Sequence, residues 1–215
     1  KGQASQTRRE IDRLIHSAES RLVGLHSPIP RPELADWAWR PDVWTAPVRP
    51  AALAPAESGA ALGADARLFH DSAAREIVLR QVRNTHEDDL APWALRFDVF
   101  GFDGSYLSLA IELPVGRVRD LRHNHVVQLD TSTDAERPVE IFARLNIRHG
   151  PNTEQIVREL PFGQPRVSTE FDLAHTRLNQ NRIERAWVDL IFGKPGMNQL
   201  TLRDLTVSRR PRSNL

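Results

Sequence analysis

The sequence has no cysteine, one methionine, one tyrosine and almost no net charge over 215 residues. Without cysteine the chain has neither disulfides nor thiolate metal sites, which favours a cytoplasmic location. A formal charge of +1 lacks the basic excess of most nucleic-acid binders, so we expect no nucleic-acid partner. There is no apolar run long enough to span a bilayer and no recognisable signal peptide. Because Lys1 comes first and the only methionine is Met197, we expect the natural N-terminus to lie upstream.

The motifs of the common catalytic classes are also missing. The sequence has no G-x-S-x-G elbow, no H-E-x-x-H, no G-x-G-x-x-G and no Walker A motif, which excludes Rossmann dehydrogenases, kinases and NTPases. His123 and His125 are the best pair for metal chemistry, but two solvated histidines at a loop are the simpler interpretation. We therefore do not expect an enzyme. A polysaccharide hydrolase stays an alternative because several carboxylates lie on or near predicted strands: Glu140, Glu154, Glu159, Glu170, Asp172 and Asp189.

Hydrophobic residues make up 40% of the chain and charged residues 27%, the balance of a globular protein that can bury a large core. The strongest local pattern is the stretch from Trp93 to Leu113, WALRFDVFGFDGSYLSLAIEL. Two runs of alternating apolar residues flank Asp103-Gly104, and this arrangement is typical of a β-hairpin. We therefore predict an antiparallel hairpin whose apolar residues share one buried face.

Further alternating runs follow at spacings of about eight to twelve residues, with turn residues between them. They are Val126–Thr131, Val139–Ile147, Ile156–Leu160, Val167–Leu173, Ala186–Phe192 and Leu200–Val207. This spacing, without β-α-β alternation, predicts an antiparallel β-sandwich of jelly-roll type over residues 64–209. We expect the last two runs to form its closing pair and residues 210–215 to be a frayed basic tail.

Two segments precede the predicted sandwich. Residues 1–27 have apolar residues at spacings of three and four, which predicts an amphipathic helix. A surface helix packed on its own domain is the simpler interpretation. The alternative is the end of an oligomerising helix, through which the protein would self-associate or dock on a protein partner as a structural or assembly subunit.

Residues 28–63, here called the strap, are rich in proline, alanine and tryptophan. Because proline fixes φ and removes a backbone donor, we expect little regular structure in the strap. Its tryptophans, Trp37, Trp39 and Trp44, have two interpretations. They either insert into grooves of the sheet or form an exposed aromatic platform for a sugar ring or a partner chain.

The closing run resembles the last strand of the jelly-roll β-sandwiches found in carbohydrate-binding modules. Those strands commonly have the pattern apolar-x-apolar-x-Asp-x-apolar, which Leu200, Leu202, Asp204, Leu205 and Val207 approximate. The resemblance implies a carbohydrate-binding-module-like fold and a structural calcium near Asp204, and no other cofactor is expected. The whole chain, including DWAWRPDVW, also resembles a bacterial domain family of unknown function, which implies no activity.

These observations favour a non-catalytic binding or interaction module, with a glycan or polysaccharide as its ligand. On such folds aromatic rings stack on a pyranose while polar side chains bind its hydroxyls. The candidate ligand-binding residues are Trp37, Trp39, Trp44, Trp93, Tyr106, Arg144, Asn146 and Arg148. Burial of the four tryptophans would remove much of the support for sugar stacking.

Overall fold

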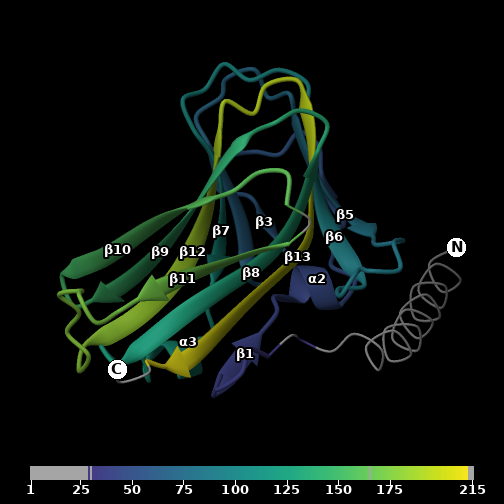
Figure 1. The fold of residues 1–215 in the computed structure, drawn as a ribbon. Helices are drawn as coiled ribbons and strands as arrows, with labels where there is room; N and C mark the ends of the chain where they lie inside the picture. Colours follow the sequence, from purple (N-terminus) through teal and green to yellow (C-terminus); the bar gives the residue numbers. More distant parts are fainter. Residues whose placement is uncertain (1–28, 30, 165, 213–215) are drawn as a thin grey trace, which may run out of the picture.

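The computed structural model describes residues 29, 31–164 and 166–212. Within these residues the strands form two sheets that face each other, as Figure 1 shows, and every strand pairing is antiparallel. The predicted antiparallel β-sandwich is therefore confirmed. The predicted helix over residues 1–27 lies outside the described residues.

The described strands divide into a seven-stranded sheet A and a six-stranded sheet B. Sheet A has the order β11 (Val167–Asp172), β8 (His125–Ala135), β13 (Asn198–Pro211), β6 (Trp93–Val99), β5 (Ile77–Arg83) and β2 (Ala52–Leu53), and β1 (Trp37–Trp39) also pairs with β13. Sheet B has the order β10 (Asn152–Leu160), β9 (Glu140–His149), β12 (Ile183–Gly193), β7 (Leu107–Glu112), β4 (Ala66–His70) and β3 (Ala61–Leu62). Two short helices, α2 (Asp42–Thr45) and α3 (Val115–Val118), complete the described elements.

The core lies between the two sheets and follows the alternation of the sequence. Leu95 and Phe97 of sheet A and Leu109 and Leu190 of sheet B have no exposed surface. The rings of Phe97 and Phe192 meet across the sandwich with their centroids 5.3 Å apart. Burial of this apolar surface is the main favourable term in folding, so the inward face of each strand was predictable.

The predicted hairpin is wrong, because β6 and β7 lie in different sheets. β6 pairs with β5 and β13, whereas β7 pairs with β4 and β12. The Asp103-Gly104 segment crosses from one sheet to the other and packs on the β4–β5 connection. Gly104 is needed there for space, because a Cβ would lie 2.7 Å from the Ser72 backbone nitrogen. The predicted closing pair is wrong for the same reason, since β12 belongs to sheet B and β13 to sheet A.

The end of β13 also differs from the predicted frayed tail. The strand continues to Pro211 by pairing with β8, while β1 pairs with its other side as far as Arg209. Arg209 is buried and binds Asp36 through two hydrogen bonds, of 3.0 and 2.8 Å. Pairing with β8 thus orders the first two residues of a tail whose polar sequence alone predicts fraying.

The strap has only short regular elements, as its prolines predict, and the last of them, β3, pairs with β4 of sheet B. β1, α2 and β2 all contact strands of sheet A, and Figure 1 shows β1 and α2 beside β13. Gln81 of β5 fixes the turn after α2, since its Nε2 donates to Val43 O and Ala46 O and its Oε1 accepts from Val48 N. Backbone groups freed by the prolines thus find side-chain partners.

The strap covers part of the outer face of sheet A, so the outer faces of the two sheets differ in their exposure. Thr206 and Ser208 alternate with the inward residues of β13, yet they are 0% and 1% exposed. The outer face of sheet B keeps large side chains exposed, including Arg67 and Phe69. Sheet B therefore offers the more accessible surface. Among the described residues, no helix has the length and apolar content to cross a bilayer.

Candidate functional site

A groove runs along β7 on the outer face of sheet B. It consists of a hollow of about 600 Å³ and an adjoining hollow of about 360 Å³, which share Phe69, Trp187 and Asp189. Both volumes are in the range of small-ligand sites. From Tyr106 to Glu112 the groove follows six residue steps, about 20 Å at ~3.4 Å per residue. It is long enough for an extended ligand.

The groove exists because β7 has small outward side chains between two strands with large ones. Leu68, Leu109 and Leu190 are cross-strand neighbours that face the core. Alternation then turns the next residues outward, so that Ala110 lies between Arg67 of β4 and Asp189 of β12. Two residues before Ala110 along β7, Ser108 lies between Phe69 of β4 and Ile191 of β12. Ser108 and Ala110 form the floor, and their neighbours form the walls.

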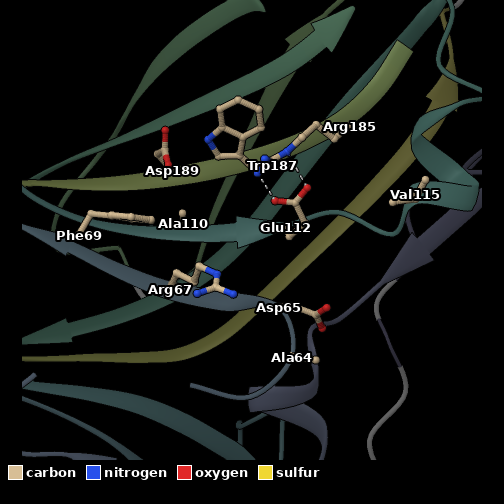
Figure 2. Close-up of a pocket in the computed structure, with 10 residues that line it drawn as sticks. All are labelled: Ala64, Asp65, Arg67, Phe69, Ala110, Glu112, Val115, Arg185, Trp187 and Asp189. Carbon is tan, nitrogen blue, oxygen red and sulfur yellow. Dashed lines mark hydrogen bonds and ion pairs between the residues drawn. The ribbon is translucent and has the colours of Figure 1, made fainter. Parts of the chain in front are cut away.

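Aromatic side chains line the groove from two strands, β4 and β12, and from the loop before β7. Trp187 is half-buried and lines both hollows, and Figure 2 shows it beside Arg185, Glu112 and Asp189. The guanidinium of Arg185 lies 4.7 Å from the centroid of the Trp187 ring and binds Glu112 through hydrogen bonds of 3.0 and 2.6 Å. Phe69 is 37% and Tyr106 is 42% exposed. Exposed aromatic area beside fixed polar groups suits a ligand with both apolar and polar faces.

A polar network holds Asp189 in place at the centre of the groove. Its Oδ2 accepts hydrogen bonds from Arg144 Nη2 at 2.8 Å, Arg144 Nε at 3.1 Å and Asn146 Nδ2 at 2.9 Å. Gln155 Nε2 in turn donates to Asn146 Oδ1 at 2.9 Å. Asp189 Oδ1 receives no hydrogen bond from any described residue. The network therefore presents one oriented acceptor with little freedom to move.

Ser108 and Asp65 are two further polar residues that line the groove. The Ser108 hydroxyl is buried and has no hydrogen-bond partner among the described residues. At the other end, burial raises the pKa of Asp65, and the negative charges of Asp42 and Glu112 raise it further. Because the Ser108 oxygen is covered by the protein, the accessible acceptor at the centre of the groove is Asp189.

Two carboxylates connect the loops at the Tyr106 end of the groove. Asp71 accepts hydrogen bonds from Ser105 Oγ at 2.5 Å, Ser105 N at 2.7 Å and Tyr106 N at 3.1 Å. Asp103 accepts from Ser72 Oγ at 2.5 Å and from two backbone amides of the same loop, at 2.9 and 3.2 Å. These hydrogen bonds lower the pKa of both carboxyl groups below the ordinary 3.8, and the bonds from the serine hydroxyls have the largest effect. The reciprocal bonds fix the position of Tyr106.

We expect this carboxylate pair to make stability depend on pH in the acid range. Lowered folded-state pKa values mean that its stabilisation is complete above about pH 4 and is lost as pH falls through the folded-state values. The double variant Asp71→Asn, Asp103→Asn should therefore melt below the wild type at about pH 7, and the difference should shrink towards about pH 3. Thermal unfolding followed by circular dichroism measures this, and a difference that is constant with pH would contradict it.

The structure brings only part of the predicted ligand-binding set together. Tyr106 and Arg144 line the groove, and Asn146 orients Asp189 beneath it. Arg148 lies further along β9, where it forms an exposed ion pair with Glu184 at 3.1 Å. The groove also contains residues absent from the predicted set: Arg67, Phe69, Ser108, Glu112, Arg185, Trp187 and Asp189. In AWVDLIF, the alternation of Trp187 and Asp189 with buried apolar residues is the signal that could have identified the outward face of β12.

The other predicted tryptophans lie away from the groove. Trp44 has no exposed surface and donates from Nε1 to Leu202 O at 2.9 Å, so it cannot stack on a ligand. Trp37 and Trp39 stack on each other at 6.4 Å between centroids and pack against the core from β1. Trp93 is half-buried in sheet A, with the guanidinium of Arg83 4.8 Å from its ring centroid. Trp44 thus follows the interpretation in which an indole inserts into the fold, while Trp37 and Trp39 are only half-buried.

Asp204 is paired with an arginine in this structure. Its Oδ1 accepts from Arg40 Nε at 2.8 Å and its Oδ2 accepts from Arg40 Nη2 at 3.1 Å. Calcium at Asp204 stays a prediction, and the cation would have to displace this guanidinium. The part of the chain that is described contains no group of three or more histidine or carboxylate side chains placed to share a metal ion.

With the fold and the groove established, comparison with known proteins identifies the family. A family model described as a family of unknown function, DUF6478, matches residues 1–215. The chain belongs to this family. The expected membership of a family of unknown function is therefore confirmed, and no sequence among the curated proteins matches the chain.

Solved structures with a similar strand arrangement include two carbohydrate-binding modules and a phage protein. The family 11 carbohydrate-binding module from Clostridium thermocellum, in complex with a beta-1,3-1,4-mixed-linked tetrasaccharide, has 11% identity and a TM-score of 0.44, covering 69% of this chain and 91% of that one. The C-terminal family 22 module of Clostridium thermocellum Xyn10B has 9% identity and a TM-score of 0.42, covering 86% and 98%. The enzymatically active domain of tailspike protein 4 from bacteriophage CBA120 has 10% identity and a TM-score of 0.47, covering 66% of this chain but only 19% of the phage chain. At these identities the likeness concerns the fold and not the ligand.

Proposed function

We propose that this protein binds a glycan chain in the groove along β7 of sheet B. The observation that carries the proposal is the combination, in one open groove, of exposed aromatic surface and a pre-ordered polar network. Trp187 and Phe69 supply the aromatic surface, and Asp189 is held by Arg144 and Asn146. A pyranose has apolar C–H faces and an equatorial rim of hydroxyls, so it needs both kinds of surface at once.

The polar groups of the groove are suited to binding hydroxyls with little reorganisation. Asp189 Oδ1 accepts no hydrogen bond from the described residues, while three donors on Oδ2 fix its direction. Groups that are already oriented lose little conformational entropy on binding, which improves affinity for a given number of contacts.

The same contacts favour binding over hydrolysis. Glycoside hydrolysis needs one carboxyl group that is protonated at working pH and a second carboxylate opposite it. Glu112 accepts two hydrogen bonds from Arg185, and Asp189 accepts two from Arg144. Glu112 and Asp189 are thus already engaged by guanidinium groups of the protein, and the hydrolase alternative would have to use Asp65, the groove carboxyl group whose pKa burial raises.

We expect Trp187→Ala to lower the affinity of this protein for its glycan by about tenfold, equivalent to ~1.4 kcal/mol, because it removes the largest stacking surface in the groove. A broad glycan array identifies the ligand class, and calorimetric titration then measures the affinity of each variant. Trp187→Phe, which keeps an aromatic ring, should retain part of the affinity.

The matched control is Trp93→Ala in sheet A. Trp93 is also a half-buried indole beside a guanidinium, at 4.8 Å compared with 4.7 Å for Trp187. Its removal should leave glycan affinity unchanged. Equal losses in the two variants, or a folded protein that binds nothing on the array, would refute the proposal. Release of reducing ends from a bound polysaccharide would indicate the hydrolase alternative instead.

A further inference from the structure

We infer that the glycan bound in the groove carries an anionic group, a uronic acid carboxylate, which Arg67 binds from the β4 side. This inference rests on the proposed function and specifies the ligand class of the same site. The arginines around the groove differ in whether they have a carboxylate partner. The guanidinium is the side-chain group best suited to bidentate binding of a carboxylate.

Three of the four arginines on this face are matched with a carboxylate of the protein. Arg144 binds Asp189 at 2.8 Å, Arg185 binds Glu112 at 2.6 Å and Arg148 binds Glu184 at 3.1 Å. Arg67 is exposed and lines the larger hollow, but no carboxylate among the described residues lies within 4.0 Å of it. Its single hydrogen bond there is a long one, 3.4 Å from Nη1 to Gly59 O. Arg67 is thus the guanidinium of this face whose carboxylate-binding capacity is unused.

The register places Arg67 where a bound sugar would meet it. Arg67, Ala110 and Asp189 are direct cross-strand neighbours on β4, β7 and β12, and Figure 2 shows all three around the same hollow. A ring above the Ala110 methyl group would have the guanidinium on one side and the Asp189 acceptor on the other. We therefore assign the carboxylate of the ligand to the β4 side and its hydroxyls to the β12 side.

The acidic side chains of this hollow do not cancel the charge of Arg67. Glu112 is neutralised by Arg185 through two hydrogen bonds, and Asp189 by Arg144. Asp65 lines the same end, where its Oδ2 accepts a hydrogen bond from Asp42 N at 3.4 Å. It forms no ion pair with Arg67 within 4.0 Å and can accept a ligand hydroxyl. Arg67 is therefore the cation available to a ligand carboxylate, on the β4 side of the groove.

The test compares acidic polysaccharides with uncharged counterparts of the same linkage. Polygalacturonate, alginate and hyaluronan, each also after chemical reduction of its carboxyl groups, are titrated against the wild type, Arg67→Gln and Arg67→Lys. We expect at least one acidic polymer to bind about tenfold more tightly than its reduced form. Arg67→Gln should remove that difference, and its effect on the affinity for the reduced form should be much smaller than its effect on the acidic form. Arg67→Lys should keep part of it, because an ammonium retains the charge without the planar fork.

Controls separate this inference from the proposed function and from general charge effects. Arg75→Gln removes an exposed guanidinium that pairs with Glu57 outside the groove and should change nothing. Dextran sulfate, compared with dextran, tests for sulfate as the anion: Arg67-dependent binding of the sulfated polymer alone would keep the anionic ligand and overturn the uronate. Equal affinity for acidic and reduced polymers, with loss of both in Trp187→Ala, would overturn this inference and leave the proposed function standing. Absence of binding to every glycan would overturn both.

Discussion

Arg40→Ala is expected to destabilise the fold by about 3–5 kcal/mol, because it leaves the carboxylate of Asp204 buried without its partner. The side chains of Arg40 and Asp204 are 1% and 8% exposed, and two hydrogen bonds join them. Burial raises the pKa of Asp204 more than Arg40 lowers it, as expected for a charge taken out of water. For a chain of this size the melting temperature should fall by about 6–20 °C.

A double replacement tests whether the cost comes from the isolated charge rather than from lost packing. Arg40→Met combined with Asp204→Leu removes both charges and keeps apolar volume, so it should recover most of the stability lost in the single variant. Arg148→Ala is the matched control, since its ion pair with Glu184 is about half exposed on both sides and should contribute only ~0.2–1 kcal/mol. A loss below about 1 kcal/mol in Arg40→Ala would show that the pair is not buried in solution. Chemical unfolding of the four proteins gives the comparison.

Trp44→Ala is expected to cost a similar amount, about 3–5 kcal/mol, because it leaves a large cavity where the strap enters the core. Trp44 of α2 is fully buried, and its indole N–H donates to the carbonyl of Leu202. That carbonyl lies where the register between β13 and β8 shifts, next to Asp204. The indole thus supplies a donor at a point where regular strand pairing is interrupted.

Trp44→Phe separates the hydrogen bond from the packing. This variant keeps most of the apolar contact and loses the donor, so it should cost about 1–3 kcal/mol. Trp93→Ala is the control for removal of a half-buried indole and should cost less than Trp44→Ala. Equal stability of Trp44→Ala and the wild type would mean that the strap is not an integral part of the sandwich. Thermal and chemical unfolding both measure these differences.

The facing of residues within each strand was predictable, but the pairing of strands was not. Leu95, Phe97, Leu107 and Leu109 are buried as the alternation predicts. However, the connection through Asp103-Gly104 crosses between sheets instead of closing a hairpin. Both topologies place the same residues inward, so local periodicity cannot distinguish them. Contacts between distant strands, such as β7 with β12, make that choice.

The candidate site was predictable to a smaller degree. Tyr106, Arg144 and Asn146 were selected, while Trp187 and Arg67 were missed. The groove depends on Ala110 and Ser108, which are small residues with no chemical motif. Only their position between β4 and β12 makes them the floor of a groove. A site that arises from the relative size of neighbouring side chains becomes visible only when the neighbours are known.

The sequence by itself determined the class of the fold, because alternating polarity and frequent turns require half-buried antiparallel strands. It also determined which side chains of each strand enter the core. The tertiary structure decided which strands are neighbours, that most of the strap packs on sheet A, and that the outer face of sheet B stays accessible. The physical reason is the range of the interactions: side-chain alternation is fixed by neighbouring residues along the chain. In contrast, the groove and the unused guanidinium of Arg67 depend on residues brought together from β4, β7 and β12.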